Sequence, residues 1–191
     1  TVVLLENLIR EAISRAKEET HKKNPSLTVE QLNDIAQAIG LGALKYPLLA
    51  RENARVVTFD WQSALDFNGQ AAPYIQYAHV RCNSILRIAH AETANLMAVF
   101  FYVLAPAEVQ LIDLISRFPT EVQRAALEYK PLIIASIAYD IAKAFASFYD
   151  KCPVIQAEKG IRNARLQLVI AAKQTMANAL RLLGIQAPEV M

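Results

Sequence analysis

The chain has 191 residues, of which 54% are hydrophobic and 20% charged, so it has enough apolar surface to form a core and is not intrinsically disordered. It contains 31 alanines but only 5 glycines and 8 prolines, and because alanine is the strongest helix former, this composition predicts an all-α protein. The scarcity of glycine argues against a nucleotide-binding sheet fold, and a net charge of +2 is too small to indicate a nucleic-acid partner by itself.

The N-terminal part of the chain predicts two helices. The β-branched residues 1–3 are typical of the end of a strand, and apolar residues then recur at helical spacing over 4–23. Thr28 followed by Gln31 matches a capping box and predicts the start of a second helix. Pro47 marks the approximate end of that helix.

The middle of the chain is divided by N-capping residues and prolines. Asp60 is typical of an N-cap for a short helix, and Pro73 suits the first turn of the next, whose apolar stripe continues to Ala89. Further on, Pro106 and Pro119 predict two shorter helices.

Two long helices are expected at the end: one from Pro131 to about Tyr149, and one over about 161–183 with Gly184 as its C′ residue. Residues 151–191 carry 6 basic and 2 acidic side chains, so the basic excess of the chain is C-terminal.

Arg162 and Arg165 lie in the first turn of the last helix, where positive charge opposes the helix dipole. Two interpretations remain open. Their stems pack while their heads reach solvent, or they form a phosphate-facing patch, since arginine forks match phosphate oxygens.

No catalytic constellation is found. On one continuous helix, His79 and His90 would be about 16 Å apart, too far to share a metal ion. Glycine-rich phosphate loops, Gly-x-Ser-x-Gly and Cys-x-x-Cys are absent from the sequence. Cys82 and Cys152 are interpreted as free thiols of a reducing cytosol, and the longest apolar run, 96–105, is about half of what a membrane-spanning helix needs.

Tyr149 is the aromatic residue most suited to ligand binding. Phe145 and Phe148 lie at core spacing on the same helix, whereas Tyr149 is at the helix end beside Asp150 and Lys151. An accessible ring there could stack on an unpaired base, an interaction of about 1 to 3 kcal/mol.

Several segments, in order and over nearly the whole chain, resemble arginyl-tRNA synthetases. Residues 59–81, FDWQSALDFNGQAAPYIQYAHVR, resemble the pattern in which an FDW block leads through a glycine-containing loop to PYxQYAxxR. Residues 39–46 (IGLGALKY) are similar to IGxGAxKY, and residues 148–154 (FYDKCPV) to FYxxCPV. Residues 182–191 (LLGIQAPEVM) resemble the closing LLGIxxPExM.

The resemblance implies a helical bundle of the class I synthetase anticodon-binding (DALR-type) kind. It implies connector and stem-contact helices over 1–72 and the anticodon-binding domain over 73–191, with tRNA(Arg) and the enzyme's own catalytic domain as partners in the cytoplasm. The HIGH and KMSKS elements are not in this sequence, which begins Thr-Val-Val without a methionine. We therefore expect a C-terminal piece that does not activate arginine alone, binds no cofactor, membrane or DNA, and leaves ATP and magnesium to the parent arginine-tRNA ligase.

The resemblance also implies residue roles. Tyr149 matches a tyrosine expected to stack near the anticodon, Met191 matches a terminal methionine close to it, and the loop 67–73 touches the anticodon stem-loop. The tRNA-binding set expected from these matches is Asn68, Gly69, Gln70, Tyr74, Arg81, Tyr149, Arg162, Arg165 and Met191. Tyr74 and Tyr77 could instead brace the bundle, and residues 90–105 have no assigned role.

Three alternatives are weighed against this interpretation. A helical protein-interaction scaffold is compatible with the composition alone. An anticodon module of another class I synthetase, such as that for cysteine, fits less well because of the FDW and PYxQYAxxR blocks. A haem or metal-binding bundle is the weakest.

Overall fold

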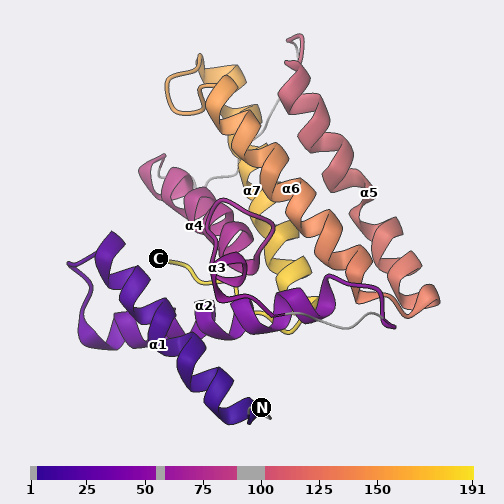
Figure 1. The fold of residues 1–191 in the computed structure, drawn as a ribbon. Coiled ribbons are helices and arrows are strands. Elements are labelled where there is room, and N and C mark those ends of the chain that lie inside the picture. Colours follow the sequence, from indigo (N-terminus) through magenta and orange to yellow (C-terminus); the bar gives the residue numbers. More distant parts are fainter. Residues whose placement is uncertain (1–3, 55–58, 90–101) are drawn as a thin grey trace.

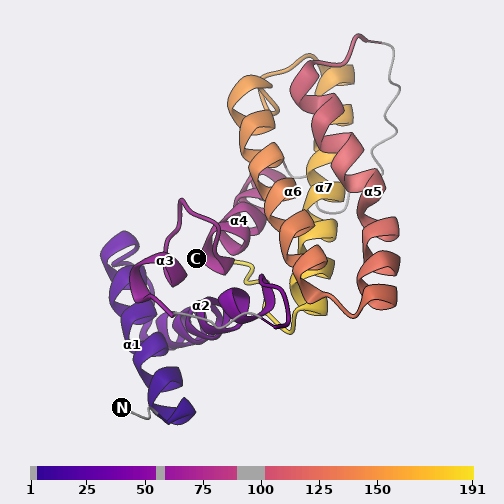
Figure 2. The same ribbon diagram turned by 45° about the vertical axis from the view of Figure 1, so that its right-hand side comes forward.

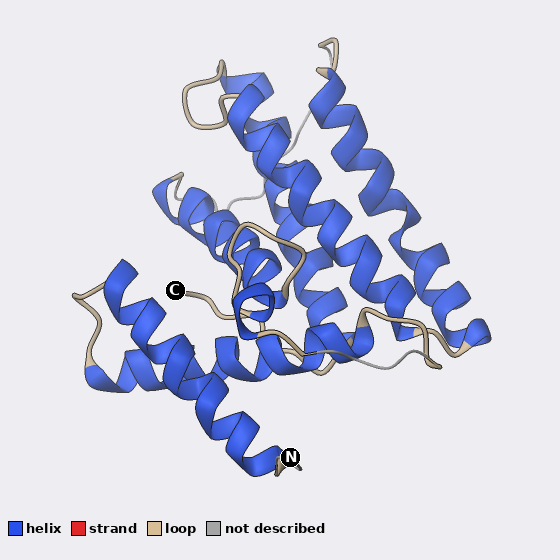
Figure 3. Cartoon of the chain, in the orientation of Figure 1, coloured by secondary structure: helices blue, strands red, loops and turns tan. Residues whose placement is uncertain are grey.

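The computed structural model describes residues 4–54, 59–89 and 102–191, and all regular elements among them are helices (Figure 3). The predicted all-α class is therefore confirmed. The residues 1–3, expected to end a strand, lie outside the described residues, as do His90 and most of 96–105. The helices are α1 (Leu5–Lys23), α2 (Val29–Leu49), α3 (Trp61–Ala64), α4 (Ala72–Ile88), α5 (Pro106–Glu128), α6 (Pro131–Lys151) and α7 (Lys159–Leu182).

Helices α4 to α7 form a bundle in which α6 contacts the other three (Figure 1). Its apolar side chains Ile137, Ile141, Phe145 and Phe148 are almost completely buried. Among the described helices, α6 alone is long and apolar enough to cross a bilayer. Its packing against α4, α5 and α7 explains that hydropathy, since a central bundle helix needs apolar residues on most of its circumference.

Helices α1 and α2 form a hairpin at one end of this bundle (Figure 2). The two helices are in contact at Gly40, where a Cβ atom would lie 2.8 Å from the backbone nitrogen of Ile13. The capping box at the start of α2 is confirmed, because the Thr28 hydroxyl accepts from Gln31 N at 3.2 Å and the Gln31 carboxamide accepts from Thr28 N at 3.0 Å. Pro47 lies inside the last turn of α2, which continues to Leu49.

The prediction of two helices divided at Pro119 is wrong, since α5 runs through this residue without interruption. An interior proline removes the hydrogen bond to the carbonyl four residues earlier and its ring crowds that carbonyl, but both effects are local, while packing holds the helix together on both sides. Leu111, Phe118 and Ala125, spaced by seven residues, are all buried.

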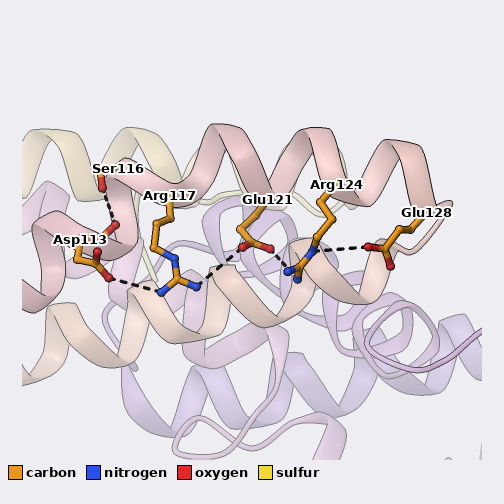
Figure 4. A network of polar contacts seen from close by, with 6 residues as sticks. All are labelled: Asp113, Ser116, Arg117, Glu121, Arg124 and Glu128. Atoms are coloured by element: carbon orange, nitrogen blue, oxygen red, sulfur yellow. Dashed lines mark hydrogen bonds and ion pairs between the residues drawn. The ribbon is translucent and has the colours of Figure 1, made fainter.

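A chain of ion pairs along α5 also spans Pro119 (Figure 4). The guanidinium of Arg117 lies 3.5 Å from the Asp113 carboxylate and 3.9 Å from that of Glu121, and Arg124 lies 2.7 Å from Glu121 and 3.9 Å from Glu128. Both arginines are 54% exposed, although Glu121 between them is only 12% exposed. Helical pairs with exposed arginines each add only a few tenths of a kcal/mol, so we attribute the continuity of α5 mainly to its buried face.

The buried side chains form two clusters. The larger one fills the bundle and includes Tyr46 of α2, whose hydroxyl donates to the carbonyl of Ala135 at 3.1 Å. The smaller one lies between α1 and α2, and Met191 at the C-terminus packs against it. The C-terminal segment, residues 184–191, therefore connects the bundle core with the α1–α2 hairpin.

Candidate nucleic-acid interface

An arginine between two exposed tyrosines forms the centre of the candidate site. The guanidinium carbon of Arg81 lies 4.4 Å from the ring centroid of Tyr149 and 5.5 Å from that of Tyr77. Tyr77 and Arg81 are four residues apart on α4, and Tyr149 belongs to the last turns of α6. The two tyrosines remain 44% and 38% exposed. The cluster thus offers a positive charge and aromatic surface to a ligand.

A cavity of about 410 Å³ lies beside this cluster and shares Tyr77 with it. Its lining residues are Thr20, Lys23, Asn24, Phe67, Asn68, Tyr77 and Met191. The Lys23 ammonium lies 4.7 Å from the Phe67 ring centroid, and the buried Thr20 hydroxyl has no hydrogen-bond partner among the described residues. Asn68, Met191, Arg81 and Tyr149, four of the expected tRNA-binding residues, therefore lie along one continuous surface.

The loop between α3 and α4 is shaped by Asp66. Its carboxylate accepts a hydrogen bond from Asn68 N at 2.8 Å, which is an Asx turn. A Cβ atom at Gly69 would meet the same carboxylate, so a larger residue there would displace the Asp66 side chain from this turn. Asn68 lines the 410 Å³ cavity, whereas Gln70 lines a second one of about 220 Å³ together with Tyr46. The loop therefore divides its expected contact residues between two cavities.

The C-terminal segment is held along α4 by three buried polar side chains. The Gln76 carboxamide donates to the carbonyl of Gln186 at 2.8 Å, and Asn83 donates to that of Glu189 at 3.2 Å. The Nδ1 atom of His79 lies 2.9 Å from the Pro188 carbonyl. This segment brings Met191 to the cavity beside Tyr77.

The family described as the DALR anticodon binding domain matches residues 75–191. The chain belongs to this family. Arginine–tRNA ligases from Thermococcus sibiricus and Chloroflexus aurantiacus are 45% and 41% identical to this chain, over 98% and 100% of its length. These matches cover 30% and 33% of the two ligases, so the chain spans about a third of the length of these curated relatives.

Solved structures of arginyl-tRNA synthetases share the fold of this chain. The arginyl-tRNA synthetase of Thermus thermophilus superposes with a TM-score of 0.92 and 34% identity over 100% of the chain and 32% of that structure. The enzyme from Plasmodium falciparum, 24% identical, shares the fold with a TM-score of 0.83, over 100% of the chain and 34% of that structure. The predicted membership in the arginyl-tRNA synthetase family is thus confirmed.

Arg165 and Tyr74, two of the expected tRNA-binding residues, have partners within the protein. The Arg165 Nε atom donates to Glu108 at 2.8 Å and its Nη1 to the Pro153 carbonyl at 2.7 Å. The ring of Tyr74 packs against Tyr139 with centroids 5.4 Å apart, and burial raises the pKa of Tyr74. These contacts favour the bracing role for Tyr74 and an internal role for Arg165.

Glu108 explains why Arg165 lies where it does. This carboxylate is 1% exposed and accepts hydrogen bonds from Arg165 and from the hydroxyl of Tyr102, both at 2.8 Å, and from Ala105 N at 2.7 Å. Burial alone would raise the pKa of Glu108, but the three donors outweigh it and lower the pKa below its usual value. Arg162, one turn earlier on α7, is half-buried, and no ion pair of its side chain occurs among the described residues.

Other residues of the site were not expected from the sequence. The sequence predicts Tyr77 only as a possible brace and Phe67 only as part of the loop 67–73 that touches the anticodon stem-loop, and it assigns no ligand contact to Lys23 or Thr20. The sequence does contain a signal for the buried polar face of α4, in the spacing of Gln76, His79 and Asn83. They are polar residues three and four positions apart on the apolar side of a helix, which places them on one buried face.

Proposed function

We propose that this chain binds the anticodon arm of tRNA(Arg) as the anticodon-binding part of an arginine–tRNA ligase. The observation that carries the proposal is the exposed cluster of Tyr77, Arg81 and Tyr149 beside the 410 Å³ cavity. The names of the related ligases support the choice of tRNA.

Recognition requires no chemistry in this chain. Sequence-specific RNA binding usually targets unpaired bases, which leave the helical stack and pack on aromatic or guanidinium planes. Tyr149 and Tyr77 offer such planes, and Arg81 between them keeps both rings in place and adds positive charge. The cavity beside Tyr77 has room for a base, with Asn68 and Met191 at its wall.

Basic side chains around the cluster would supply the salt-dependent part of the affinity. We assign Lys23 and Arg162 to this group, since both are outside the buried ion pair of Arg165 with Glu108. If Arg165 bound a phosphate, its guanidinium group would have to contact the phosphate and Glu108 at the same time. Gly69 and Gln70 act through the loop, which we place against the anticodon stem-loop.

Residues 1–72 are proposed to connect to the catalytic domain of the ligase and to contact the tRNA stem, and residues 73–191 to bind the anticodon. ATP and magnesium are assigned to that catalytic domain, in the cytoplasm. Among the residues that the structure describes, no group of three His, Cys, Asp or Glu side chains could hold a metal ion, so no metal-dependent step is assigned to them.

The test is binding of this chain to transcripts of tRNA(Arg) with the cognate anticodon and with an exchanged one, at two salt concentrations. We expect Tyr149→Ala to weaken cognate binding by about 5- to 150-fold, the equivalent of losing one base stack, and to affect the exchanged transcript much less. Tyr149→Phe retains the ring and should bind nearly as well as the unmutated chain.

Tyr129→Ala is the matched control, because Tyr129 is an 83% exposed tyrosine at the end of α5. It should leave binding unchanged. Equal losses for both transcripts on Tyr149→Ala, or binding that is equal for both anticodons and abolished by salt, would contradict anticodon reading by this surface.

A further inference from the structure

The C-terminal segment turns back over the bundle as soon as α7 ends. Gly184 makes the turn with a φ of 64°, which favours glycine, and its carbonyl accepts a hydrogen bond from Lys45 of α2. Ile185 is then buried in the bundle core, and Met191 packs on the cluster between α1 and α2. The segment thus reaches from one hydrophobic cluster to the other.

Three side chains of α4 hold the backbone of this segment. Gln76, His79 and Asn83 lie on one face of α4, and each is bonded to a carbonyl of the segment, at residues 186, 188 and 189. A carbonyl oxygen only accepts, so Nδ1 of His79 must carry the proton in this contact. All three side chains are buried, between 0% and 7% exposed, so none of them is accessible to an RNA.

The stability of α4 does not explain why carboxamide side chains are buried at positions 76 and 83. The carboxamide oxygens of Gln76 and Asn83 are buried and have no hydrogen-bond partner among the described residues. Burying an unpaired acceptor costs free energy that an apolar side chain of the same size would not cost. What the amides add at these positions is donation of their N–H groups: Asn83 donates to the C-terminal segment, and Gln76 donates both to the segment and, at 3.1 Å, to the Ala38 carbonyl of α2.

We propose that Gln76, His79 and Asn83 are positioning residues for RNA binding: they hold residues 184–191 so that Met191 forms a wall of the cavity beside Tyr77. This inference rests on the proposed function of that surface. A chain whose segment is released lacks one wall of the cavity. Its affinity then falls in proportion to the fraction of molecules in which the segment is held.

The first test uses two substitutions of His79. His79→Leu fills the same space without a donor, whereas His79→Asn retains an N–H two bonds from Cβ, where Nδ1 stands in histidine. For His79→Leu we expect greater mobility of residues 184–191 in NMR relaxation, because the ratio of held to released segment falls about three- to tenfold, the range set by one neutral hydrogen bond. Cognate tRNA should bind more weakly, with this factor as the upper limit, since the affinity follows the held fraction. His79→Asn should restore both properties. Gln76→Met should release the segment too, although it also removes the bond of Gln76 to the Ala38 carbonyl of α2.

A cycle with Met191→Ala shows whether the effect passes through the segment. If His79 acts by placing Met191, the double variant should bind about as weakly as Met191→Ala alone, because the contact is already lost. Full additivity would overturn the proposal, and so would a released segment with unchanged affinity. Ile75→Val is the control, since Ile75 is buried on the same helix. It should change stability without changing the mobility of the segment or the RNA affinity.

The mobility measurement needs no RNA, which separates this inference from the function on which it rests. If α4 does not hold the segment, residues 184–191 are equally mobile with and without the His79 substitution, and the proposal is wrong. If the surface does not bind the anticodon, the unmutated chain itself fails to prefer the cognate transcript.

Discussion

Arg165 has either an internal role, as the partner of Glu108, or an RNA-binding role. Its replacement by methionine distinguishes the two. The substitution retains much of the apolar stem but leaves the Glu108 carboxylate, 1% exposed, without its cationic partner. Removing one member of a buried ion pair costs about 3 to 5 kcal/mol. Tyr102 and Ala105 still donate to the carboxylate, so we expect about 3 kcal/mol, the lower end of this range.

The assay is chemical denaturation at pH 7 combined with tRNA binding at several salt concentrations. Arg162→Met is the matched control on the same helix and should change the free energy of unfolding by less than about 0.5 kcal/mol, as substitutions at accessible positions do. The same control should lower the salt dependence of tRNA binding by about one phosphate contact. Replacing Glu108 by glutamine together with Arg165→Met should recover part of the lost stability, because the buried charge is then removed.

The opposite pattern would refute this reasoning. If Arg165→Met leaves the free energy of unfolding unchanged and lowers the salt dependence of binding, then Arg165 contacts a phosphate. In that case the pair with Glu108 contributes nothing to folding, and the expectation from the family resemblance holds.

Three further predictions concern stability alone. Burial lowers the pKa of His79 and outweighs the Pro188 carbonyl and Glu189, which raise it, while Lys173 lowers it further. The unfolded chain therefore binds more protons, and the free energy of unfolding should fall as the pH drops below about 6.5. His79→Asn should remove this dependence in denaturation measurements between pH 7 and pH 5, and an unchanged slope would contradict it. Gly40→Ala should destabilise the chain by about 1 to 3 kcal/mol, because its Cβ would meet the backbone of α1 at 2.8 Å. Gly160→Ala in α7, where a Cβ meets nothing within 4 Å, should stabilise it by about 0.4 to 1 kcal/mol, and thermal unfolding of both variants compares the two.

The helices were predictable where a local signal decides the structure. Asp60 caps α3 with its carboxylate on Ser63 N at 2.8 Å, and Pro131 and Gly184 mark helix ends as expected. Pro119 was misinterpreted because its cost is local whereas the compensation comes from α6, which sequence alone does not place. The spacing of Leu111, Phe118 and Ala125 contained the correct answer, since it keeps one helical phase across the proline.

The site was predictable only in part, for the same reason. Tyr77 and Arg81 are neighbours by helical spacing, but the contact of Arg81 with Tyr149 depends on how α4 packs on α6. Arg165 shows the converse, since its guanidinium group and the family resemblance suggested a phosphate contact, whereas the buried Glu108 that pairs with it is 57 residues away. Long-range partners of charged residues decide their roles, and local patterns do not contain them.

The cavity beside Tyr77 is built from both of the expected parts of the chain, residues 1–72 and residues 73–191. The cavity beside Tyr77 is lined by Lys23 of α1, by the loop with Asn68, by α4, and by Met191 at the other end of the sequence. Residues on both sides of the division therefore build one surface, and the segment 184–191 ties its two hydrophobic clusters together. A change that loosens the α1–α2 hairpin should weaken RNA binding even when α4 to α7 remain folded, because the cavity exists only where the hairpin and the bundle meet.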